Sequence, residues 1–147
     1  MHQKIAAAAI FKVLVFSAVA LGGCGQSKIS ECNALVGVLN TGAQDIHART
    51  NAITSKPEAI AEYKALAEAA EKVAESASKV EVRSPELKKL SADYQATMRE
   101  FAKAAREIAA ADAKDIPKMN AAANTIEKVG KDEEQLVGEI NKFCQAP

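Results

Sequence analysis

The sequence predicts an all-α protein, an antiparallel up-down-up-down four-helix bundle that follows an N-terminal signal peptide. Helix-favouring alanine, glutamate, lysine and leucine are abundant in the 147 residues, whereas aromatic residues make up only 4%. Apolar residues recur at alternating spacings of three and four in four stretches. The stretches are separated by short segments that carry helix-start signals, and short connections between helices favour antiparallel neighbours.

Residues 1–23 have the composition of a signal peptide. The basic residues Lys4 and Lys12 precede Val13–Gly23, an uncharged stretch of 11 residues. A helix needs about 20 apolar residues to cross a bilayer, so this stretch fits the apolar region of a signal peptide better than a membrane span. It runs into Leu21-Gly22-Gly23-Cys24, which resembles the lipobox of bacterial lipoproteins.

The resemblance implies that Cys24 becomes the acylated first residue of the mature protein. An anchor with two or more acyl chains is sufficient for stable membrane attachment. In the sorting rule of enterobacterial lipoproteins, Asp after the cysteine retains the protein at the inner membrane, and this chain has Gly25 there. The resemblance therefore implies a protein anchored in the outer membrane and facing the periplasm, with residues 24–28 as a short tether. The alternative is an ordinary signal peptide with a chance cysteine near its end.

The bundle domain is expected over residues 29–147, beginning with a helix over 29–53. The second helix is expected to start near residue 56, because Ser55-Lys56-Pro57-Glu58 combines a capping box with a proline in the first turn. Its expected face consists of Ile60, Tyr63, Leu66, Ala67, Ala70, Val73, Ala74, Ala77 and Val80. The seam of the first helix consists of Ile29, Cys32, Val36, Leu39, Ala43, Ile46 and Ile53.

Two further helices follow the same logic. Ser84 is expected to cap the third helix with Pro85 in its first position, and Asp115 is expected to cap the fourth. Each of the four helices is expected to span about 25 residues, close to 37 Å. The expected seams are Leu87, Leu90, Tyr94, Thr97, Phe101, Ala104 and Ile108, then Met119, Ala122, Ile126, Val129, Leu136, Ile140 and Phe143.

Two cysteines test the topology. Cys32 lies near the start of the first helix and Cys144 near the end of the fourth, and these ends coincide in an up-down-up-down bundle. A lipoprotein resides in an oxidising compartment, so the sequence predicts a disulfide between Cys32 and Cys144. Two buried free thiols are the alternative.

The residue types present exclude most familiar catalytic and metal-binding sites. His2 leaves with the signal peptide, so His47 is the single histidine of the mature chain and the paired-histidine metal motifs are excluded. No catalytic or metal-binding residue, no cofactor and no enzymatic activity are predicted. One ligand hypothesis is considered, in which His47 and either Met98 or Met119 hold a haem. The mature chain has 17 basic and 19 acidic residues, which argues against a nucleic-acid partner.

Glu133 interrupts the apolar seam of the fourth helix between Val129 and Leu136. Gly130 and Gly138 flank it, and glycine in a helix interior costs about 1 kcal/mol relative to alanine. The sequence therefore predicts a locally weak stretch that forms a kink or an exposed partner-binding turn. Frayed packing in a small bundle is the alternative.

The alanine-rich seams favour a structural or protein-interaction module anchored through Cys24. Small seam residues bury little area, so a second copy or another envelope protein would add burial. The alternative is a periplasmic carrier that holds a small apolar ligand or haem within the bundle. The segment Glu31-Cys32-Asn33-Ala34-Leu35-Val36-Gly37-Val38-Leu39-Asn40 resembles the start of small predicted lipoproteins of unknown function. That resemblance implies a cysteine-stapled helical lipoprotein and brings no activity with it.

Overall fold

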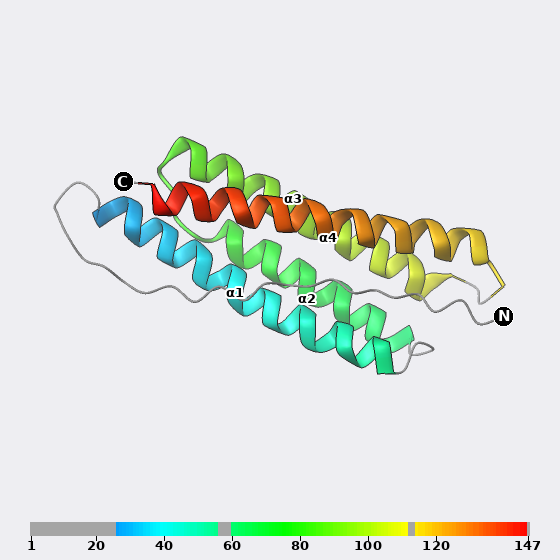
Figure 1. The fold of residues 1–147 in the computed structure, drawn as a ribbon. Helices are drawn as coiled ribbons and strands as arrows, with labels where there is room; N and C mark the ends of the chain where they lie inside the picture. Colours follow the sequence, from blue (N-terminus) through cyan, green and yellow to red (C-terminus); the bar gives the residue numbers. More distant parts are fainter. Residues whose placement is uncertain (1–25, 56–59, 112–113, 147) are drawn as a thin grey trace.

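The computed structural model describes residues 26–55, 60–111 and 114–146. This described part contains four helices and no strand, which confirms the all-α class. The helices are α1 (Gln26–Ser55), α2 (Ile60–Ser78), α3 (Pro85–Ala110) and α4 (Ile116–Gln145). They lie alongside one another as an elongated body (Figure 1).

The helices differ in length more than the sequence predicted. Helices α1 and α4 each have 30 residues and α3 has 26, so α1 and α4 exceed the expected length of about 25 residues. Helix α2 is described over 19 residues. It ends at Ser78, whose hydroxyl donates a hydrogen bond to the carbonyl oxygen of Glu75, so Val80 lies in the connection beyond it. The expected start of this helix near residue 56 lies outside the described residues.

Helix α1 begins at Gln26, three residues before the expected position. Residues 26–28, predicted as part of the tether, thus belong to the helix. Lys28 accounts for the extension, because its Nζ donates a 2.6 Å hydrogen bond to the carbonyl oxygen of Ala146 and lies 4.7 Å from the ring centre of Phe143. Both residues lie at the end of α4, which gives the first turn of α1 a tertiary support.

The starts of α3 and α4 lie where the sequence placed them. Asp115 caps α4 by accepting a 3.2 Å hydrogen bond from the backbone N–H of Lys118, as predicted. Ser84 occupies the N-cap position of α3, but its side chain does not bond to the helix. Its hydroxyl and its backbone N–H both donate to Oε2 of Glu31 instead, at 3.0 and 3.1 Å.

The helices pack in chain order. Helix α2 packs closely on α3, α3 on α4 and α1 on α2, whereas α1 and α4 meet over a small area only. Small residues allow the close approach of α2 to α3 and of α1 to α2. Ala67, Ala70, Ala102 and Ala105 are fully buried on α2 and α3, and a Cβ at Gly42 of α1 would overlap the side chain of Val73.

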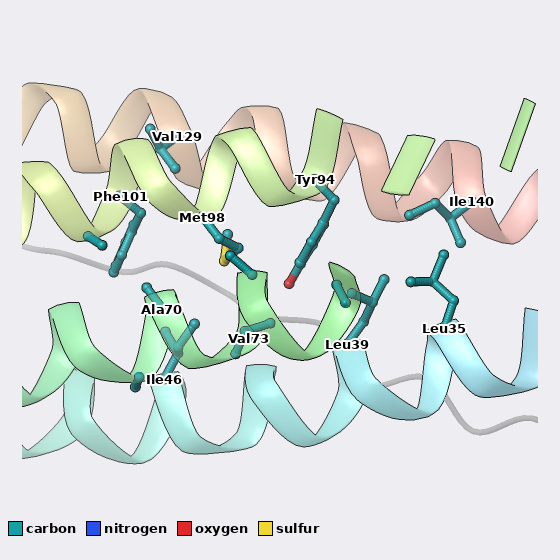
Figure 2. Close-up of a cluster of buried hydrophobic side chains, with 14 of the residues drawn as sticks. Leu35, Leu39, Ile46, Ala70, Val73, Tyr94, Met98, Phe101, Val129 and Ile140 are labelled. Carbon is teal, nitrogen blue, oxygen red and sulfur yellow. The ribbon is translucent and has the colours of Figure 1, made fainter. Parts of the chain in front are cut away.

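All four helices contribute to one apolar core (Figure 2). Helix α4 contributes least, since only four of its described residues are buried: Ala122, Val129, Glu133 and Ile140. Two expected seam residues are exposed: Ile29 to 39% and Ile60 to 53%. Both stand within the first turns of their helices, where fewer neighbouring elements can cover them. The residues of the core labelled in Figure 2 are Leu35, Leu39, Ile46, Ala70, Val73, Tyr94, Met98, Phe101, Val129 and Ile140.

Candidate functional site

A disulfide joins the start of α1 to the end of α4, as the sequence predicted. Cys32 and Cys144 are 112 residues apart in the chain, and their Cα atoms are 5.7 Å apart. The bond lies where α1 and α4 approach each other, and the two helices diverge from this end (Figure 1). Closing a loop of this size stabilises the folded state by about 5 kcal/mol in the chain-entropy model.

Glu31 adds a second link at the same end. It is only 8% exposed, and its carboxylate accepts both hydrogen bonds from Ser84, which precedes α3. The backbone hydrogen bond from Ser84 is the largest cause that lowers the pKa of Glu31, and the Ser84 hydroxyl and the nearby Arg83 also lower it. With the disulfide and Lys28, Glu31 thus joins α1 both to the α2–α3 connection and to α4. We call this the clasped end.

Glu133 is the second unusual acidic residue. It is 6% exposed, and α4 continues through it and through Gly130 and Gly138 without a break. The predicted exposed turn is therefore wrong. The side chain is accommodated within the packed helix pair because it faces Tyr94 of α3.

The environment of Glu133 favours its protonated form. The pKa of Glu133 is raised to about 7, chiefly by burial and also by the negative charge of Glu134, while Tyr94 acts in the opposite direction. Tyr94 is fully buried, and burial raises its pKa as well. The Tyr94 hydroxyl lies near enough to Glu133 for each group to affect the pKa of the other, yet it forms no hydrogen bond of standard geometry.

The haem hypothesis finds no support in the placement of its residues. His47 is exposed on α1, and its Nδ1 lies 3.2 Å from Nδ2 of Asn51 on the same helix. Met98 is buried in the core, while Met119 is half-buried near the start of α4. The structure thus does not bring His47 and Met98 together across the core.

The described residues also bear on metal binding and on membrane crossing. No cluster of three or more His, Cys, Asp or Glu side chains suited to a metal ion occurs among the described residues. Cys24, the predicted lipidation site, lies outside them. None of the helices in the described part of the chain combines the length and apolar character that crossing a bilayer requires.

The pairing of Cys32 with Cys144 is predictable from the sequence, whereas the role of Glu31 is not. The available signal was its position next to Cys32, on the edge of an apolar helix face. Glu133 was recognised as an anomaly, but its partner Tyr94 was not. Comparison with known proteins adds no relative: no family model matches the chain, and no curated protein or solved structure matches it either.

Proposed function

We propose that this chain is a lipid-anchored lipoprotein of the bacterial cell envelope, and that its helical body is a non-catalytic structural or protein-interaction module. The observation that carries the proposal is Leu21-Gly22-Gly23-Cys24 directly after an uncharged run of signal-peptide length. The disulfide between Cys32 and Cys144 supports it, because stable disulfides belong to compartments such as the periplasm.

The body of the proposed lipoprotein is an up-down-up-down antiparallel bundle. Support comes from the disulfide, which places the start of α1 beside the end of α4. The hydrogen bonds between Glu31 and Ser84 place the α2–α3 connection at the same end. In Figure 1 the chain reverses direction from each helix to the next.

A lipid on Cys24 would orient this body. Helix α1 begins at Gln26, so only Gly25 separates the helix from the anchor. The clasped end would therefore face the membrane closely. Among the described residues, the two most exposed large apolar side chains are those of Ile60 at 53% and Ile116 at 61%, which begin α2 and α4 at the opposite end, where a protein partner would be met.

Metabolic labelling tests the anchor. Bacteria expressing the full chain are fed an alkyne-bearing fatty acid, and membrane fractions are probed for label and intact mass. We expect label on the wild type, and we expect a Cys24→Ser variant to be unlabelled and unprocessed. A Cys32→Ala, Cys144→Ala variant is the matched control, which keeps its label. An unlabelled wild type that accumulates in the membrane fraction would contradict the proposal.

Crosslinking in native envelopes tests the interaction module. The wild type is compared with an Ile60→Glu, Ile116→Glu variant, which changes the exposed apolar residues without touching the core. We expect a reproducible crosslinked partner or a second copy with the wild type and a loss of that product with the variant. If no product forms and an apolar small molecule co-purifies in native mass spectrometry, the carrier alternative replaces the interaction module.

A further inference from the structure

Glu133 is an acidic residue in a position built for an apolar side chain. It lies on the face of α4 that packs on α3, between Val129 and Leu136 in the seam. Only 6% of the residue is exposed. A carboxylate without water or a full set of hydrogen bonds is costly in such surroundings, whereas a neutral carboxylic acid is tolerated.

Tyr94 is the polar group that α3 presents to Glu133. Figure 2 shows its side chain reaching across the core, with the hydroxyl between Val73 and Leu39. The hydroxyl is buried and has no hydrogen-bond partner of standard geometry. A charged Glu133 would thus have one imperfectly placed donor, which is too little to replace its lost hydration.

We propose that the contact between α3 and α4 is a pH-responsive joint, in which Glu133 is protonated while α4 is packed on α3 and loss of the proton loosens α4 from α3. The joint is a property of the folded chain beyond its proposed role as an anchored module, and it operates with or without a lipid on Cys24.

The electrostatic environment sets the pH at which the joint responds. Among the described residues, Tyr94 of α3 and Glu134 of α4 are the groups that act on Glu133, and no charged group of α1 or α2 does so. The negative charge of Glu134 favours the protonated form, and burial acts in the same direction. The pKa of Glu133 is about 7, so its protonation changes near neutral pH.

The attachment of α4 determines which part can move. Its C-terminal end is fixed to α1 by the disulfide, and α1 covers little of the rest of the helix. The space beside Gly130 and Gly138 is open, and glycine weakens the helix on both sides of Glu133. Deprotonation would therefore release residues 116–133 first, while the clasped end stays in place.

Hydrogen exchange on the mature, oxidised protein tests the joint at pH 6 and pH 8, with rates corrected for the intrinsic effect of pH. We expect protection within residues 116–133 to fall by about tenfold at pH 8 relative to the change in α2. A Glu133→Gln variant should retain at pH 8 the protection seen at pH 6. The neighbouring, exposed Glu134 provides the control, since Glu134→Gln should keep most of the pH dependence of the wild type.

A ¹³C NMR titration of the glutamate carboxyl groups in the wild type tests the same proposal without relying on a variant that folds. We expect one glutamate with a midpoint near pH 7, and we expect its signal to be lost in Glu133→Gln if that variant folds. Either of two results would overturn the proposal: a Glu133 midpoint near the ordinary value of 4.5, or the same pH-dependent exchange in the wild type and in Glu133→Gln.

Discussion

Removing the disulfide should cost this protein a large share of its stability. The change is a double substitution, Cys32→Ala with Cys144→Ala, which leaves no lone thiol. The two residues are 112 apart in the chain, and the chain-entropy model gives about 5 kcal/mol for releasing a loop of that size. Domains of this size are stable by about 5–15 kcal/mol in total, so the loss decides whether the body remains folded.

The structure offers little to offset that loss. Helices α1 and α4 meet over a small area, and a hydrogen bond from Lys28 Nζ to the carbonyl oxygen of Ala146 also links their ends. Without the disulfide, the start of α1 and the end of α4 should be free to separate in the unfolded chain. In the folded protein these two helix ends should fray. Helices α2 and α3 pack closely along each other and should lose helicity last.

Urea unfolding followed by circular dichroism measures the effect. With a slope of about 2 kcal/mol per molar urea, a loss of about 5 kcal/mol lowers the midpoint by about 2.5 M. We compare the urea midpoints of the oxidised wild type, the wild type in reductant and the double variant. The reduced wild type and the double variant should have the same midpoint. A midpoint shift below about 0.5 M in both would refute the reasoning, because it would mean that other contacts hold the two helix ends together.

Four other changes have expected outcomes. Glu133 has a pKa of about 7 in the folded protein, against its ordinary value of 4.5. Its contribution to the free energy of unfolding is therefore complete below pH 4.5 and falls by about 3 kcal/mol as the pH rises to 7. Urea unfolding at pH 5 and pH 8 should show most of this fall in the wild type and none of it in Glu133→Gln. The pH dependence due to Glu31 has the opposite sign, because the pKa of Glu31 is lowered in the folded protein. Its contribution to the free energy of unfolding is present above pH 4.5 and is lost as the pH falls through the folded pKa. Glu31→Gln should therefore make stability depend less on pH in acid unfolding monitored by circular dichroism. Gly42→Ala should cost about 1–3 kcal/mol through its clash with Val73, and adding Val73→Ala should recover part of it in thermal melts. His47→Ala should leave the melting temperature unchanged, and haem added to the wild type should give no Soret shift, because His47 is exposed whereas Met98 is buried in the core.

The parts of the fold that the sequence predicted well depend on local signals. Pro85 starts α3 and Asp115 caps α4 because the first turn of a helix needs particular residues, whatever surrounds it. The disulfide was predictable for another reason. Cys32 and Cys144 lie near the two ends of the domain in the sequence, and four helices that alternate in direction would bring those ends together.

The parts that the sequence could not predict depend on residues far apart in the chain. Ser84 has the sequence signature of a cap, but Glu31, 53 residues earlier, takes both of its donors. Nothing local to Ser84 reveals that competition. Likewise, the break in the seam at Glu133 was visible, but its outcome depended on Tyr94 and on the burial that α3 provides.

The intact mass of the mature protein, purified from envelopes without reductant, tests the anchored and disulfide-joined body most directly. We expect a chain that begins at Cys24, carries acyl chains on that residue and holds Cys32 and Cys144 in a disulfide. A chain that begins elsewhere and carries no acyl group, with two free thiols, would contradict it.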